Sequence, residues 1–161
     1  MSNGMKLALF ALLVATAYGT AWFKAYQLSK QYSIYAHQQL EERNFLFALK
    51  GMNKLELRQG DHYLGGFQQV LETWESSMLG PKPPFYEEAL TMPQKIIAQL
   101  NQQQLEAFIE TYVELDVRYV PEAVEQLRLV ALQNGNTVLA DEMNEFLLEA
   151  FPSYQPKLGM E

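Results

Sequence analysis

The sequence predicts an all-α protein in which a single N-terminal transmembrane helix is followed by a soluble domain of helical hairpins. Residues 7–23 carry no charged side chain. Beyond them, apolar residues recur at helical spacing, and no segment shows the sustained alternation of a half-buried strand. Apolar residues make up 48% of the 161 positions, which suits a packed core better than a disordered chain.

The uncharged segment lies between Lys6 and Lys24. As a helix it spans roughly 25 Å, the short end of what crosses a bilayer. Small residues recur on one face at Ala11, Ala15 and Gly19, and small residues let a second transmembrane helix approach closely. Aromatic residues gather at the C-terminal end, as in a membrane-interface belt: Tyr18, Trp22, Phe23 and Tyr26.

A secretory signal peptide is the alternative for this segment. Lys6 would supply the basic region, residues 7–14 the apolar region, and Ala15-Thr16-Ala17 the small-residue cleavage site. Cleavage would release a soluble helical binding module. The apolar run continues through Phe23, which favours an uncleaved anchor with the amino terminus inside and the body in the periplasm or an equivalent space. The flanking lysines are nearly balanced and leave the side open.

Charge is distributed unevenly along the rest of the chain. Residues 24–60 hold six Lys/Arg and three Asp/Glu, whereas residues 61–161 hold five and sixteen. A basic stem near a membrane is attracted to anionic headgroups. The net charge of −7 argues against nucleic acid as a partner. The chain has no cysteine, which excludes disulfides, thiolate nucleophiles and Cys-ligated zinc.

The order of elements follows from periodicity and capping signals. Residues 24–58 are predicted to continue the anchor helix as a stem, with apolar positions that include Leu28, Phe47 and Leu49, ending at Gln59-Gly60-Asp61. The next helix is predicted to bury Leu64, Phe67, Leu71, Trp74 and Met78, and Gly65-Gly66 at its start indicates a close backbone contact. Three prolines make residues 80–84 a loop.

Two capping signals follow the loop. Thr91 with Gln94 predicts the start of a short helix that carries Ile96, Ile97 and Leu100, and Asn101 with Gln104 predicts the start of a longer one. The longer helix places Leu105, Phe108, Ile109, Tyr112 and Leu115 on one face.

The last two predicted helices form a hairpin. Pro121 opens a helix that buries Ala123, Val124, Leu127, Val130 and Ala131. Asn134-Gly135-Asn136 makes the turn. The second helix buries Leu139, Met143, Phe146, Leu147 and Ala150 and stops at Pro152.

Residues 121–154 resemble one tetratricopeptide repeat, a 34-residue helix–turn–helix unit. Gly135 falls in the turn, and Ala140 stands five residues later, where this family needs a small residue. Leu127 and Pro152 also match. Arg128, Asn144 and Leu147 depart from the pattern, and a generic αα-hairpin fits the same residues. The resemblance implies a scaffold that grips a peptide or helix of a partner.

The sequence shows no clear catalytic or metal-binding constellation. His37 has only Glu41 as a candidate partner one turn away, and His62 follows Asp61 at a predicted helix start. A metal site needs three or four ligands. Carboxylate pairs such as Glu110 and Glu114 fit solvated helix faces. No nucleophile motif or phosphate loop occurs. We expect no enzyme activity, cofactor or metal.

The predicted organisation has four parts: an anchor or uncleaved signal (residues 1–23), a helical stem (24–60), a helical soluble domain (61–151) and a C-terminal tail (152–161). The expected partners are the lipid bilayer and other membrane protein subunits in a heteromeric complex. The expected role is that of an accessory, assembly or scaffold subunit.

Overall fold

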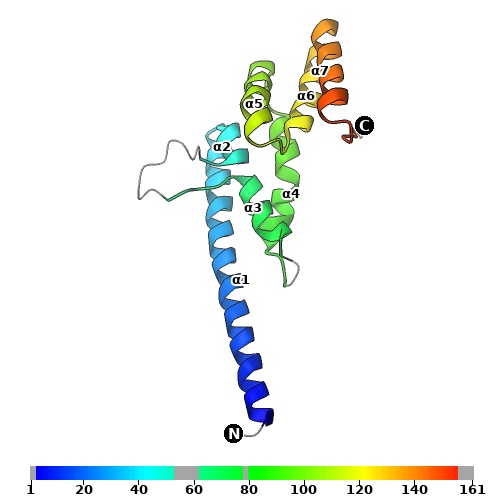
Figure 1. Cartoon of the computed structure of the whole chain (residues 1–161). Coiled ribbons are helices and arrows are strands. Elements are labelled where there is room, and N and C mark those ends of the chain that lie inside the picture. Colours follow the sequence, from blue (N-terminus) through cyan, green and yellow to red (C-terminus); the bar gives the residue numbers. More distant parts are fainter. Residues whose placement is uncertain (1–2, 53–61, 78–79, 156–161) are drawn as a thin grey trace. The chain divides into compact units, whose positions relative to one another are not determined.

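The structure is a computed structural model that describes residues 3–52, 62–77 and 80–155. These residues form helices α1 (Asn3–Glu41), α2 (Phe45–Lys50), α3 (Phe67–Glu75), α4 (Pro84–Ile97), α5 (Gln102–Leu115), α6 (Val120–Gln133) and α7 (Thr137–Ala150), and they contain no strand (Figure 1). The predicted all-α fold is therefore confirmed. The contacts divide the chain into two units, Met1–Leu90 (unit 1) and Thr91–Glu161 (unit 2), and the division falls within α4.

Helix α1 changes character along its length. Every residue from Asn3 to Ala21 is exposed, whereas the later part packs against α2 and α3. The residues buried there are small or polar: Ser29, Ser33, Ala36 and Gln39. Leu28, predicted as an apolar position of the stem, is 44% exposed. Small side chains on the buried face let α3 approach α1 closely.

The predicted continuous helix over residues 24–58 is wrong, because α1 ends at Glu41. Arg43 adopts a left-handed conformation with φ of 60°. The Arg43 amide donates to the Leu40 carbonyl at 3.0 Å, and the Asn44 amide donates to the Gln39 carbonyl at 2.8 Å. These two bonds form a Schellman motif, which usually has glycine in the left-handed position. The predicted stop at residues 59–61 lies outside the described residues.

The glycines before α3 form the close backbone contact that the sequence predicted. A Cβ on Gly66 would lie 2.5 Å from the Ala48 carbonyl oxygen and 2.6 Å from that of Leu49. The Gly66 amide donates to the Gln69 side chain at 2.7 Å, and the helix begins at Phe67 with Gly66 as its N-cap. Phe67, Val70, Leu71 and Trp74 are buried as predicted. Leu64, predicted in the same helix, precedes it and is half-buried, and Met78 lies outside the described residues.

The predicted helix start at Thr91 is also wrong. Residues 91–94 lie inside α4, which already begins at Pro84. Proline suits a first helical position because its φ is preset and its missing N–H would be unpaired there anyway. Pro93 therefore sits within the helix, and the short segment after residue 91 is the second half of α4.

Unit 2 follows the predicted order. Asn101 and Gln104 make a reciprocal capping box, with the Gln104 amide 2.9 Å from the Asn101 side chain. Helix α6 packs against α5 on one side and α7 on the other. The turn at residues 134–136 joins α6 and α7 into the predicted hairpin. Several residues predicted to be inward are not buried. Leu115 is 70% exposed and Ala150 is exposed. The half-buried ones are Ile109, Tyr112, Val130, Leu139, Met143 and Phe146.

Candidate functional site

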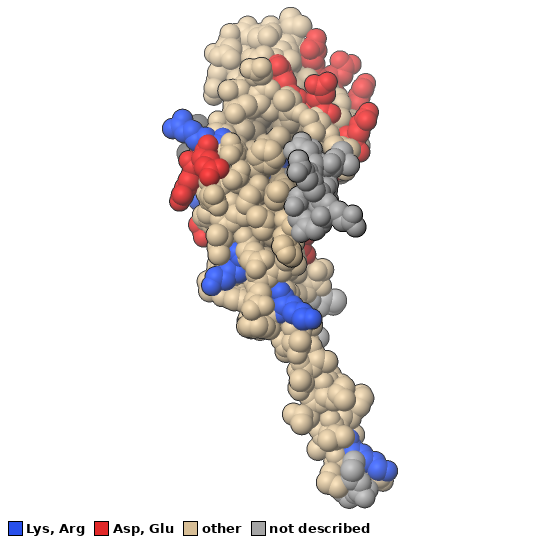
Figure 2. Space-filling model, turned by 90° about the vertical axis from the view of Figure 1, so that its left-hand side faces the viewer, with Lys and Arg blue, Asp and Glu red and all other residues tan. Residues whose placement is uncertain are grey.

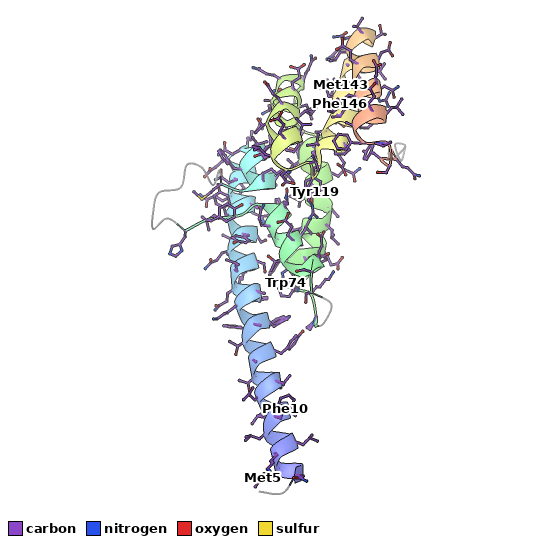
Figure 3. All side chains as sticks on the ribbon, viewed as in Figure 1. Met5, Phe10, Trp74, Tyr119, Met143 and Phe146 are labelled. Carbon is purple, nitrogen blue, oxygen red and sulfur yellow. The ribbon has the colours of Figure 1, made fainter. Side chains whose placement is uncertain are left out.

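The exposed part of α1 is the most unusual surface of the described chain. Leu7, Phe10 and Leu13 are 73%, 67% and 63% exposed. Their neighbours Leu9, Leu12 and Val14 are similarly exposed, so the helix is apolar on every side. Figure 2 shows this stretch as a continuous uncharged surface between blue side chains, and Figure 3 shows Phe10 projecting from it with no other element alongside. A helix that is apolar all round needs a membrane or other protein around it.

Among the described helices, α1 is the one long and apolar enough to cross a membrane. A signal sequence near the N-terminus meets the same criterion, and so does a buried core helix. In this structure the apolar window is not buried by any other part of the described chain.

An open apolar groove runs along this helix and includes two of the three predicted packing residues. It has a volume of about 740 Å³ and is lined by Leu7, Phe10, Ala11, Val14, Ala15, Tyr18 and Gly80. Ala11 and Ala15 have the smallest side chains on the α1 side of the groove. Gly19, the third predicted residue, is not part of its lining, and a Cβ added there would meet nothing within 4 Å.

Two of the four predicted interface aromatics pack within unit 1. Trp22 stacks on Tyr26 with 5.5 Å between ring centroids, and it lies 5.8 Å from Trp74 of α3. Tyr26 in turn lies 5.7 Å from Phe85 of α4. We name these four residues the aromatic cluster. Tyr18 and Phe23 lie outside it and are 43% and 54% exposed. The sequence identified the α1 aromatics but not the α3 and α4 residues that they contact.

The turn before α4 lies against the same face of α1. The Trp22 indole N–H donates to the Pro81 carbonyl at 3.1 Å. Gly80, with φ of +103°, lies so close to the Tyr18 hydroxyl that a side chain there would collide with it. Lys82, two residues after Gly80, donates to the Tyr86 hydroxyl at 3.1 Å, with its ammonium 4.2 Å from the ring centroid. These contacts hold residues 80–82 beside the end of the apolar segment.

A buried hydrogen bond fixes α3 on α1 just beyond the aromatic cluster. The Trp74 indole N–H donates to the Ser29 hydroxyl at 2.9 Å, and both residues are almost fully buried. The Ser29 hydroxyl in turn donates to the Ala25 carbonyl at 2.8 Å. Figure 3 shows Trp74 where α3 packs on α1.

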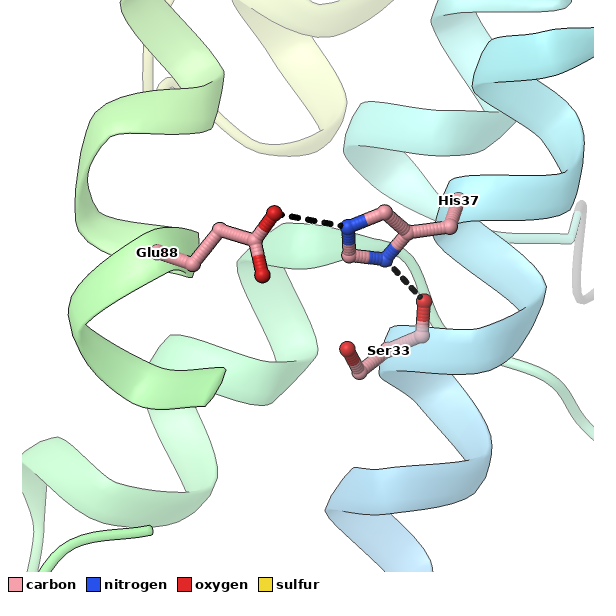
Figure 4. A network of polar contacts seen from close by, with 3 residues as sticks. All are labelled: Ser33, His37 and Glu88. Atoms are coloured by element: carbon pink, nitrogen blue, oxygen red, sulfur yellow. Dashed lines mark hydrogen bonds and ion pairs between the residues drawn. The ribbon is translucent and has the colours of Figure 1, made fainter. Parts of the chain in front are cut away.

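His37 joins α1 to the N-terminal half of α4 (Figure 4). Its Nε2 lies 3.1 Å from a Glu88 carboxylate oxygen, and its Nδ1 lies 2.8 Å from the Ser33 carbonyl. The ring also makes an edge contact with Phe67 at 5.0 Å. Burial lowers the pKa of His37, but the hydrogen bonds to Ser33 and Glu88 and the charges of Glu88 and Glu41 outweigh burial and raise it above 6.5. Glu88 was not considered as its partner from the sequence.

The predicted hairpin residues lie as follows. Leu127 and Ala140 are 1% and 3% exposed. Gly135 has φ of 73°, a left-handed turn conformation. Pro152 is exposed, beyond the end of α7.

The tail after the hairpin returns to α6. Tyr154 is half-buried there, and burial together with the charges of Glu122 and Glu125 raises its pKa to about 12. Glu125 also pairs with Arg128 at 2.8 Å.

Within residues 3–52, 62–77 and 80–155, no group of three or more His, Asp or Glu side chains is placed to hold a metal ion. Comparison with protein-family models, with curated proteins and with solved structures gives no match to this chain. A function for the chain is therefore inferred from the apolar helix, the aromatic cluster and the hairpin.

Proposed function

We propose that the chain is a membrane-anchored, non-catalytic helical protein that serves as an accessory, assembly or scaffold subunit of a membrane complex. The observation that carries the proposal is the apolar, uncovered first part of α1. Six large apolar side chains between Leu7 and Val14 are about half to three-quarters exposed. Moving them from water to an apolar environment is worth roughly 5–10 kcal/mol, which favours a bilayer around them.

The helices of unit 2 support a role in binding proteins. The resemblance of residues 121–154 to a tetratricopeptide repeat favours a scaffold. Helices α6 and α7 also expose apolar side chains that could contact a partner: Leu129, Leu132, Val138 and Leu148. Four carboxylates of α7 are exposed, namely Asp141, Glu142, Glu145 and Glu149. Such an acidic surface attracts a basic partner segment over long range.

The anchor is tested by placing a charge in it. Leu13→Arg puts a cation near the middle of the apolar segment, where insertion scales assign about 2.5–3.5 kcal/mol to arginine. We expect the variant to shift from the carbonate-resistant membrane fraction toward the soluble or degraded fractions. Leu148→Arg is the matched control, because Leu148 is 67% exposed and Leu13 is 63% exposed. If both variants stay with membranes, or wild type is soluble, the anchor is refuted.

Intact mass separates an anchor from a cleaved signal. If the segment is an anchor, we expect the native protein to retain residues 1–17. A mature chain that begins at Tyr18 and is soluble would instead identify an exported helical binding module.

The complex is tested through the small-residue face. Ala15→Leu with Gly19→Leu should fill the face where another helix would pack and reduce the yield of a stoichiometric partner in mild detergent. Ala17→Leu with Ala21→Leu is the matched control, because these residues lie on other faces of the helix at the same spacing. A wild type that purifies as a monomer without a partner would overturn the subunit role.

A further inference from the structure

We infer that the turn at residues 80–82 is a second membrane contact, seated in the lipid headgroup layer beside the point where α1 leaves the bilayer, with Lys82 facing lipid phosphates. This inference rests on the proposed membrane anchor. It adds a surface on unit 1, outside α1, that contacts anionic lipid.

The contacts of the turn with α1 set its depth. Tyr18 and Trp22 are the residues that touch Gly80 and Pro81. Trp22 is adjacent to Phe23, the last residue of the uncharged segment, and Tyr18 is about 7.5 Å before Phe23 along the helix axis. If residues 7–23 cross the hydrocarbon, then Tyr18 and Trp22 lie at its edge. The turn that packs on them lies at the same level.

The chemistry of the turn suits this level. The exposed residues Gly80 and Pro81 carry no charge, and Pro81 has no N–H that would need a partner away from water. An unpaired backbone carbonyl is costly in an apolar layer. The carbonyl of Pro81 avoids that cost because it accepts from the Trp22 indole.

Lysines lie where the phosphates would be. Lys82 is exposed and rests over the Tyr86 ring, with its ammonium donating one hydrogen bond to the Tyr86 hydroxyl. An ammonium has three donors, so two remain for phosphate oxygens. On α1, the exposed Lys30 lies 6.0 Å from the Tyr26 ring. Aromatic rings with lysines beside them are the usual composition of a membrane interface.

Spin labels can measure the depth, because the chain has no native cysteine. Pro81→Cys labels the turn and leaves its backbone carbonyl in place. Val14→Cys labels the anchor, and Gln38→Cys labels an exposed position further along α1. Each full-length variant is reconstituted in vesicles of phosphatidylcholine and phosphatidylglycerol. Electron paramagnetic resonance then measures its collision rates with oxygen and with a water-soluble nickel chelate.

The expected result is a gradient of three depths. The label at position 14 should favour oxygen strongly, the label at 38 should favour the nickel chelate, and the label at 81 should collide with nickel several-fold less often than the label at 38. A label at 81 as accessible to nickel as that at 38, with position 14 in lipid, overturns this inference and leaves the anchor intact. A water-exposed label at 14 overturns the anchor as well.

The lysine is tested separately. Shielding at position 81 should be stronger in vesicles that contain phosphatidylglycerol than in phosphatidylcholine alone, and Lys82→Gln should remove most of that difference. If Pro81→Cys disturbs the turn, seen as a changed near-ultraviolet tryptophan signal, a label at Lys82→Cys gives the same depth reading. No dependence on anionic lipid with wild-type Lys82 would overturn the phosphate contact.

Discussion

Ser29→Ala removes the acceptor of the buried hydrogen bond that joins α3 to α1. The Trp74 indole N–H would then have lost its partner at 2.9 Å, in a position where Trp74 is 2% exposed and Ser29 is 0% exposed. Leaving a buried donor unpaired costs about 1–3 kcal/mol. The bond that Ser29 donates to Ala25 adds little to this, because that carbonyl is already a backbone acceptor within the helix.

The measurement is the free energy of unfolding of the full chain in mild detergent, followed by the near-ultraviolet tryptophan signal. Ser33→Ala is the control, because it removes a hydroxyl from the same buried face of α1 and leaves the Trp74 bond intact. We expect Ser29→Ala to lower the stability by about 1–3 kcal/mol and Ser33→Ala to lower it less.

A second background sharpens the test. Trp74→Phe removes the donor, so Ser29→Ala should then cost less than it does in the wild-type chain, with a coupling of about 0.5–3 kcal/mol. This comparison is followed by far-ultraviolet circular dichroism, because it changes a tryptophan. Equal costs in the two backgrounds, or equal costs of Ser29→Ala and Ser33→Ala, would refute the role of this bond.

Three further variants test other parts of the structure. Gly66→Ala should lower stability by about 1–3 kcal/mol or more, because its Cβ would lie 2.5 Å from the Ala48 carbonyl oxygen. The control Gly19→Ala should not lower it, because a Cβ there meets no atom within 4 Å. Equal melting temperatures for the two variants would contradict the contact at Gly66. Ala140→Phe should overpack the α6–α7 hairpin by about 1–3 kcal/mol, whereas Leu148→Phe, at an exposed position of α7, should not; an unchanged melting temperature for Ala140→Phe would refute the packing. His37→Gln tests the pH dependence: because the pKa of His37 is raised above 6.5, its stabilisation is fully present below 6.5 and is lost as the pH rises through the folded-state pKa. The stability difference between wild type and His37→Gln should therefore shrink from about pH 6 to about pH 8, and an NMR titration that gives His37 a pKa below 6.5 would contradict this.

The sequence predicted those parts of the fold that depend on local signals. The capping pair Asn101 and Gln104, the turn at Gly135 and the helix start at Pro121 act over a few residues, and each is confirmed. The end of α1 was missed because Arg43 occupies the left-handed position where glycine is the usual signal. The start of α4 was missed because Thr91 and Gln94 imitate a capping box inside a helix that already begins at Pro84.

The contacts of the site depend on residues that are distant in sequence. His37 meets Glu88 across 51 positions, and Trp22 meets Pro81 across 59. Periodicity identifies which residues share a helix face, but not which other helix that face meets. The buried face of α1 was missed for another reason. Ser29 and Ser33 are polar, and a pattern of large apolar residues does not mark a helix face whose small side chains permit close packing.

The unbroken course of α1 from Asn3 to Glu41 has a mechanical consequence. Because no hinge separates the apolar segment from the part that packs on α2 and α3, rotation of the segment about its axis must turn those helices with it. Successive residues on a helix are about 100° apart. A shift of one residue in the face that the segment presents to a neighbouring helix would therefore turn unit 1 by about 100° about the same axis. In the proposed complex, the identity of the small residues near the N-terminus would thus decide which side of unit 1 faces the partner.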